Sequence, residues 1–197
     1  MKPLQSVAMG LVVVGLTAAF GSYDALADPL GWVLVLLGVL RLPADVERRT
    51  VLAALAALAG AVSVPLWLPA VAEAVADLDA SVSWALALPQ LGFVAVLCHV
   101  LARRASAAGD ETAARRLRLA VTLTAVVAAL PVLVLGAGVE VLGTPAAALA
   151  VLTLVLVVWQ LFACSGRPWA GAPAPLDAPR APGRPGGDSP AADRSGP

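Results

Sequence analysis

Apolar residues fall into six long runs that are separated by short polar connectors. The runs cover residues 4–22, 29–42, 51–71, 83–102, 119–139 and 145–164. All but the second approach the twenty apolar residues that a membrane-spanning helix needs. The connectors are too short to form soluble domains. This pattern predicts an all-α fold: a polytopic transmembrane helix bundle of six spans, arranged as three hairpins.

The second run is shorter than a bilayer requires. Residues 29–42 would rise about 21 Å as a helix, against a hydrocarbon core of about 30 Å. Asp28 and Pro29 still form a good helix start, because the carboxylate can cap free N–H groups and proline needs no donor there. With Trp32 near one interface and Arg41 near the other, a full crossing is favoured over a re-entrant segment.

Positive charges give the predicted orientation, because Lys and Arg are retained on the cytoplasmic side of short loops. The bases are Lys2, Arg41, Arg48, Arg49, Arg103, Arg104, Arg115, Arg116, Arg118, Arg167, Arg180, Arg184 and Arg194. If six spans start with the N-terminus inside, all of these fall inside and the outer connectors carry only acids. The sequence therefore predicts that both termini are inside. Trp32 and Trp67 would then mark the outer interface, and Trp159 the inner one.

Composition favours lipid as the solvent of this chain. Of its 197 residues, 60% are hydrophobic and 13% are charged, with a mean hydropathy of +0.88, far from the norm for soluble domains. Thirteen bases balance thirteen acids, so no nucleic acid is expected as a partner. The lipid bilayer is the first predicted partner, followed by a second copy of the chain or another membrane protein.

The two ends of the chain carry separate expectations. An apolar run after "MKPLQS", followed by "ALA" at 25–27, resembles a cleavable secretory signal, but its single lysine favours a retained first helix. Residues 165–197 hold eight prolines and six glycines and little that could be buried. They are predicted to form a disordered, Pro/Gly-rich cytoplasmic tail.

Small residues recur at helical spacing and would let helices approach closely in lipid. They are Gly15 and Ala19 in the first run, Gly31 and Gly38 in the second, Ala53, Ala57 and Ala61 in the third, and Ala125 and Ala129 in the fifth. Packing inside the bundle is the preferred interpretation, and an oligomer interface is the alternative. The glycine face of the second run is expected to meet a close neighbour, for which the fourth run is the candidate.

The second and fourth runs also resemble each other. "LGWVLVLLGVL" at 30–40 aligns with "LGFVAVLCHVL" at 91–101, which matches Trp32 to Phe93. A duplication would make the two segments parallel repeats, each followed by a further helix. Chance similarity is the alternative, because an alphabet dominated by Leu, Val, Ala and Gly produces such matches easily.

Few polar groups lie within the apolar runs. Gln90, His99 and Gln160 could line a path for a small neutral solute, or could simply bond to nearby carbonyls. Prolines at positions 65, 69, 89 and 131 fall inside predicted helices, where each removes a backbone hydrogen bond.

Enzyme motifs are missing from the sequence. It contains no G-x-S-x-G, H-E-x-x-H or phosphate loop, and no acid in the middle third of any run, where proton-coupled carriers usually place one. Cys98 and Cys164 fit neither a disulfide framework nor a zinc spacing. No catalytic residue, metal site or cofactor is predicted.

The stretch "YDALADPLGWVLVLLGVLRLP" resembles a segment of small uncharacterised actinobacterial multi-pass membrane proteins, in which D-P-x-G-[WY] opens a helix and R-x-P follows. This resemblance implies a bacterial plasma-membrane location and no specific activity. The predicted function is a non-enzymatic accessory or scaffold membrane subunit. The alternative is a carrier or channel subunit for a small neutral solute.

Overall fold

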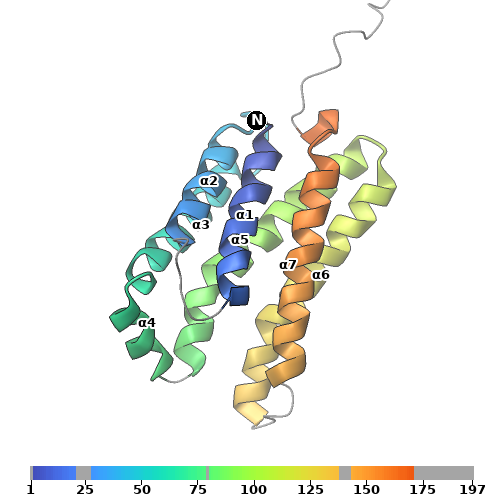
Figure 1. The fold of residues 1–197 in the computed structure, drawn as a ribbon. Coiled ribbons are helices and arrows are strands. Elements are labelled where there is room, and N and C mark those ends of the chain that lie inside the picture. The colour runs from blue at the N-terminus through green and yellow to red at the C-terminus, as the bar shows by residue number, and fades with distance from the viewer. Residues whose placement is uncertain (1, 21–27, 79, 138–142, 171–197) are drawn as a thin grey trace, which may run out of the picture.

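The computed structural model describes residues 2–20, 28–78, 80–137 and 143–170, and within these ranges every regular element is helical. The elements are α1 (Pro3–Phe20), α2 (Asp28–Leu40), α3 (Arg49–Leu66), α4 (Pro69–Ala76), α5 (Ala80–Ala107), α6 (Glu111–Ala137), α7 (Gly143–Cys164) and the short 3-10 helix η2 (Pro168–Ala170) (Figure 1). The all-α prediction is confirmed. Among the described residues, three helices are long and apolar enough to cross a membrane: Arg49–Leu66, Ala80–Ala107 and Thr144–Cys164.

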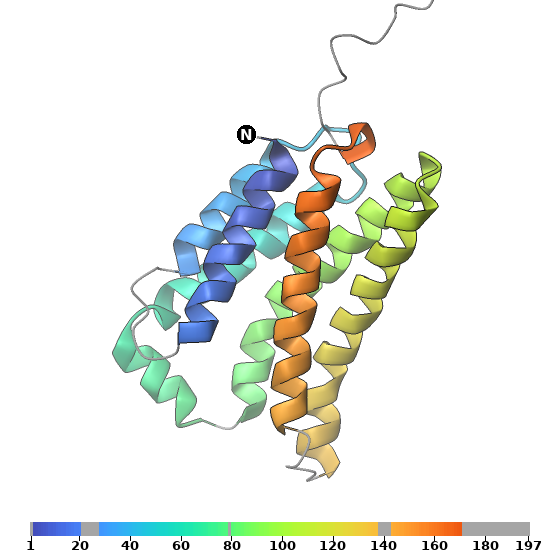
Figure 2. The same ribbon diagram turned by 45° about the vertical axis from the view of Figure 1, so that its right-hand side comes forward.

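The long helices pack in an order that closes on itself. Each of α1, α2, α3, α5, α6 and α7 packs against the next, and α7 returns to pack against α1 (Figures 1 and 2). The short α4 lies against α3 and α5. This order brings α1 and α7, from opposite ends of the chain, side by side.

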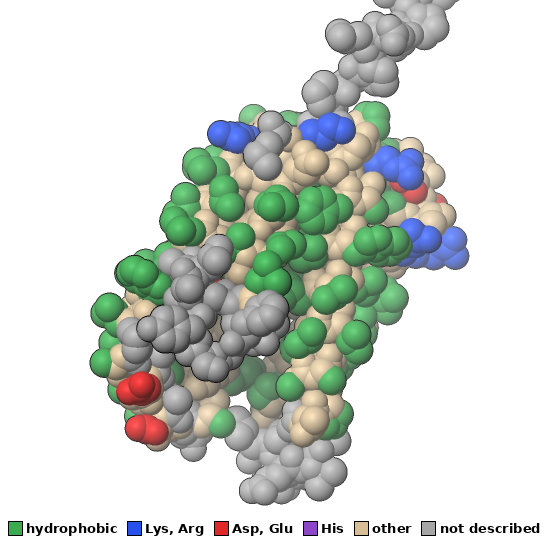
Figure 3. Space-filling model, viewed as in Figure 1, with side chains coloured by type: hydrophobic (Ala, Val, Ile, Leu, Met, Phe, Trp, Pro, Cys, Tyr) green, Lys and Arg blue, Asp and Glu red, His purple; other side chains and the backbone are tan. Residues whose placement is uncertain are grey.

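The basic side chains of the described residues are confined to one end of the bundle. Helices α1, α3 and α6 begin, and α2, α5 and α7 end, at what we call the basic end, where all Lys and Arg of the described residues lie. In Figure 3 the blue side chains gather at this end together with a few red ones, whereas the red side chains at the opposite end have no blue ones beside them. The described part of the bundle therefore has one basic end, which carries acids as well, and one end without bases.

The predicted helix at 51–71 is interrupted. α3 ends at Leu66, Leu68 is extended with φ −79° and ψ 119°, and Pro69 opens α4. The residue before a proline is pushed out of the helical region, and a proline fits the first turn of a new helix. Pro69 therefore separates two helices, whereas Pro65, Pro89 and Pro131 lie inside helices as expected.

The glycines of α2 face α1, and not the helix predicted from the fourth run. A Cβ placed on Gly31 would lie 2.8 Å from the carbonyl oxygen of Gly10, and one placed on Gly38 would lie 2.9 Å from that of Pro3. The hydroxyl of Ser6 donates to the Leu34 carbonyl at 3.0 Å. Backbones this close need hydrogen atoms in place of side chains, so these glycines set the spacing between α1 and α2.

Trp32 is a core residue and not the interfacial anchor that was predicted. Its side chain is 3% exposed and meets the ring of Phe93 edge-on, with ring centroids 5.7 Å apart. The two residues are matched in the alignment of 30–40 with 91–101, and both segments run toward the basic end. The aligned aromatic pair thus joins α2 to α5.

The buried core lies in the half of the bundle near the basic end. In α5, every buried residue lies at or beyond Phe93. The largest fully buried side chains include Leu11, Phe93, Leu97, Leu117 and Leu161. Large apolar side chains are also exposed along α2, α3 and α7, as expected for surfaces that face lipid rather than water.

The chain remains folded for six residues beyond the predicted start of the tail. Residues 165–170 turn back at the end of α7, the backbone N–H of Ala170 donates to the backbone carbonyl of Arg167 at 3.0 Å, and Ala170 is buried. Residues 165–170 therefore belong to the folded bundle, because η2 packs against α5. The rest of the predicted tail and the "ALA" at 25–27 lie outside the described residues.

Candidate functional site

A groove of about 610 Å³ opens in the middle of the bundle, bordered by α1, α5, α6 and α7. It borders the buried core and is lined mainly by aliphatic side chains, among them Leu11, Leu16, Val94, Val127, Leu154 and Val155. Val151 and Val155 are each about 60% exposed, so the groove is open to the surroundings of α7. Its chemistry therefore favours an apolar occupant.

The polar groups in the groove wall are few. The hydroxyl of Thr124 donates to the Ala120 carbonyl at 2.8 Å, and that of Thr153 donates to the Leu149 carbonyl at 2.7 Å. Both donors are therefore used inside their own helices, a common state for Thr within helices. Gln90, half-buried, is the remaining polar side chain among the described lining residues.

Aromatic residues and a base mark the end of the groove nearest the basic end. Trp159 and Phe162 of α7 line it there, and the guanidinium carbon of Arg116 lies 5.8 Å from the centre of the Trp159 ring. A cation over an indole face is favourable, and the pair sits where a membrane interface would place both groups.

The three polar residues predicted to form a path are not brought together. Gln90 lines the groove, but neither His99 nor Gln160 is among its lining residues. His99 is exposed on α5, whereas Gln160 is 3% exposed in α7. A solute path through all three side chains is not formed by this arrangement.

The predicted packing residues divide into a group that packs within the bundle and a group that faces outward. Gly15 meets Leu154 of α7, because a Cβ on Gly15 would lie 2.7 Å from a Leu154 methyl group, and Ala53 is half-buried. The outward-facing residues are Ala57, Ala61, Ala125 and Ala129, all exposed. The side chain of Ala19 lies outside the described residues. Bundle packing in α3 uses the neighbouring face, where Ala56 is buried.

Two packing residues were missed from the sequence. Among the glycines that the structure describes, Gly10 lies closest to a neighbouring backbone, since its Cβ would be 2.5 Å from the Gly31 carbonyl oxygen. Ser6 lies one turn before Gly10 and is buried. Their small-x-x-x-small spacing was the signal that could have found them.

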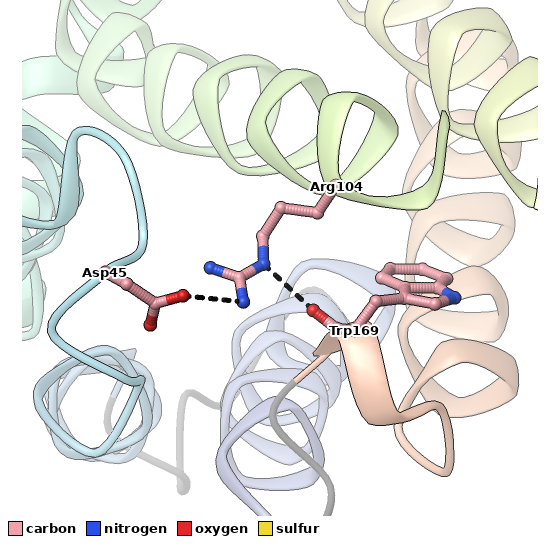
Figure 4. Close-up of polar contacts among 3 residues, drawn as sticks. All are labelled: Asp45, Arg104 and Trp169. Carbon is pink, nitrogen blue, oxygen red and sulfur yellow. Dashed lines mark hydrogen bonds and ion pairs between the residues drawn. The ribbon is translucent and has the colours of Figure 1, made fainter. Parts of the chain in front are cut away.

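Ion pairs join the connectors at the basic end. Arg104 pairs with Asp45 at 3.1 Å and donates through Nε to the Trp169 carbonyl at 2.9 Å (Figure 4). Arg103 pairs with Glu47 at 3.0 Å, but both partners are more than half exposed. Arg104 therefore ties the loop after α2 and the segment after α7 to the end of α5.

A second cluster shapes the turn between α5 and α6. Gly109 has φ +78°, a left-handed conformation suited to glycine at a helix end. Asp110 then accepts the N–H of Ala113 at 3.1 Å as a helix cap and lies 3.7 Å from Arg167. These interactions fix loop structure, and we assign them no chemical role.

Within the described ranges, no group of three His, Cys, Asp or Glu side chains is arranged to hold a metal ion. The comparisons with known proteins give no further guide to the site: no family model, curated protein or solved structure matches this chain.

Proposed function

We propose that this protein is a non-enzymatic accessory or scaffold subunit of the bacterial plasma membrane, crossing it six times with both termini inside. The segregation of bases supports this orientation, because Lys and Arg are retained on the cytoplasmic side. The short α2 is flanked by α1 and α3, which fits a helix that needs shielding to cross.

The observation that carries the accessory role is the pair of small, outward-facing stripes on α3 and α6. Ala57 and Ala61 lie one turn apart on α3, Ala125 and Ala129 lie one turn apart on α6, and all four are exposed. Their exposure leaves them accessible to a partner, and Ala61 also lines a hollow that α3 forms with α4 and α5. Flat faces of this kind allow another transmembrane helix to approach closely without a hydrophobic driving force.

Reporter fusions test the orientation. A fluorescent protein that matures only in the cytoplasm should be bright at either terminus, and a phosphatase that is active only outside should be inactive there. The same phosphatase inserted between Asp77 and Ala80 should be active, because this point lies at the end opposite to the bases. An active phosphatase at the N-terminus would contradict the six-span topology.

Site-specific photocrosslinking tests the accessory role. A photoreactive residue at Ala61 or Ala129 should yield one recurrent protein adduct at native expression, either with a second copy of the chain or with another membrane protein. The same residue at Ala56, which is 1% exposed, is the matched control and should yield none. If the photoreactive residue at Ala61 and Ala129 formed adducts with lipid and none with protein, the result would count against the proposal.

The second candidate is a carrier or channel subunit for a small neutral solute, favoured by the presence of Gln90 in the groove wall. Such a path must admit water. A Gln90→Cys variant should then react with a membrane-impermeant thiol reagent, whereas Cys98, which is fully buried, should not. Absence of labelling at residue 90 would remove the basis for the carrier.

A further inference from the structure

The apolar groove and Arg116 belong to one continuous surface. On α6, Arg116 precedes Thr124 by eight residues and Val127 by eleven, spacings that place all three near one face of the helix. Thr124 and Val127 line the groove, and Arg116 lies over Trp159, which also lines it. The groove therefore ends at a cation.

Arg116 is available to an external anion. Arg103, Arg104, Arg118 and Arg167 each pair with a carboxylate, whereas Arg116 forms no ion pair within the part of the chain that the structure describes. Its guanidinium lies over the ring of Trp159, a residue that is 55% exposed. A guanidinium held by an aromatic face keeps its N–H groups free for phosphate oxygens.

The length of the groove matches one leaflet of a bilayer. Between Ala150 and Phe162, which both line it, α7 rises about 18 Å at about 1.5 Å per residue. Half of a hydrocarbon core is about 15 Å. An acyl chain starting at the level of Phe162 would thus contact the groove over its whole depth in that leaflet.

The groove wall selects against a polar occupant. The hydroxyls of Thr124 and Thr153 are already bonded to carbonyls of their own helices, and most of the wall is aliphatic. An acyl chain needs no hydrogen bonds and gains contact along the whole groove.

We propose that the groove is a binding site for an anionic phospholipid, with one acyl chain along α7 and the headgroup phosphate on Arg116. The apolar wall supplies the chain site, and the cation at its end supplies the preference for negative charge. The site goes beyond the accessory function and does not depend on it, because a lipid could occupy this groove in a scaffold that has no crosslinked partner.

Lipid retention tests the headgroup contact. The full-length protein in nanodiscs of phosphatidylcholine and phosphatidylglycerol should retain one phosphatidylglycerol when released for native mass spectrometry. Arg116→Gln should lower that retention about tenfold, which corresponds to about 1.4 kcal/mol, near the low end of the contribution of a hydrogen bond to a charged group. Arg115→Gln is the matched control: it removes the same charge from the neighbouring exposed residue and should leave retention unchanged.

A second pair of variants tests the chain site. Ala150→Phe should fill the far end of the groove and reduce retention, whereas Ala148→Phe, at an exposed residue that is not part of the lining, should not. Glycerol phosphate without acyl chains should fail to displace the lipid. Three results would each overturn the proposal. They are an equal loss of lipid retention in Arg115→Gln and Arg116→Gln, equal retention of phosphatidylcholine and phosphatidylglycerol, and equal effects of the two phenylalanine substitutions.

Discussion

Replacing Gly10 with alanine is expected to lower the free energy of unfolding by about 1–3 kcal/mol, the range typical of overpacking a tight contact. The added Cβ would lie 2.5 Å from the Gly31 carbonyl oxygen and 2.9 Å from the Val35 backbone nitrogen. Backbone atoms cannot rotate away, so α1 and α2 would have to separate. Unfolding by SDS titration in detergent micelles would measure the loss.

Separation would spread along the helix pair. The Ser6 hydroxyl, which donates to the Leu34 carbonyl at 3.0 Å, would move away from it, and the close contact between Gly38 and α1 would be lost.

Gly92→Ala is the matched control, because its nearest contact would be a Leu55 methyl group at 3.7 Å. We expect that variant to be neutral or slightly more stable, as alanine favours helix. Equal stabilities for the two variants would show that the α1–α2 contact is not tight.

The α1–α2 contact also shows what the sequence could not predict. In water, an apolar stripe identifies the buried face of a helix, but a helix in lipid is apolar on all sides. The six apolar runs and the Asp28–Pro29 helix start could therefore be recognised in the sequence, whereas the face of each helix that packs in the bundle could not. The regular alanine spacing drew attention to Ala57 and Ala61, although the bundle uses the face with Ala56.

Local backbone chemistry explains a second discrepancy. Pro65 and Pro69 were both assigned to one kinked helix, but only the second proline starts a new helix. Leu68 must stay extended before Pro69, whereas Pro65, late in α3, is tolerated within the helix. The spacing of two prolines by four residues did not distinguish a kink from a break.

The groove was beyond sequence reasoning because its parts come from separate helices. Gln90 could be recognised as a polar residue in an apolar run, yet its surroundings depend on which helices border α5. The contact between Arg116 and Trp159 joins residues that were assigned separately, one to a connector and the other to an interface. Only the packing of α6 against α7 brings them together.

Replacing Arg104 with glutamine is expected to destabilise the protein by about 1.5 kcal/mol and to release the segment after α7. Arg104 makes a charge-assisted hydrogen bond to the Trp169 carbonyl and an ion pair with Asp45, contacts worth about 1.5–3 kcal/mol when well formed. We take the lower end because the Arg104 side chain is 25% exposed and that of Asp45 is 68% exposed. Hydrogen exchange should report loss of protection at Ala170, whose N–H bonds to Arg167.

Arg103→Gln is the matched control, because it removes the same charge one residue away. The side chains of Arg103 and Glu47 are 61% and 55% exposed. Loss of their ion pair should therefore lower the free energy of unfolding by less than about 0.5 kcal/mol and leave hydrogen exchange at Ala170 unchanged. Arg104→Lys should fall between the wild type and Arg104→Gln, since one ammonium group keeps the charge but lacks the planar fork that serves two acceptors. If the amide of Ala170 exchanged at the same rate in both glutamine variants, the specific contacts of Arg104 would not be what holds the segment. The prediction would then be wrong.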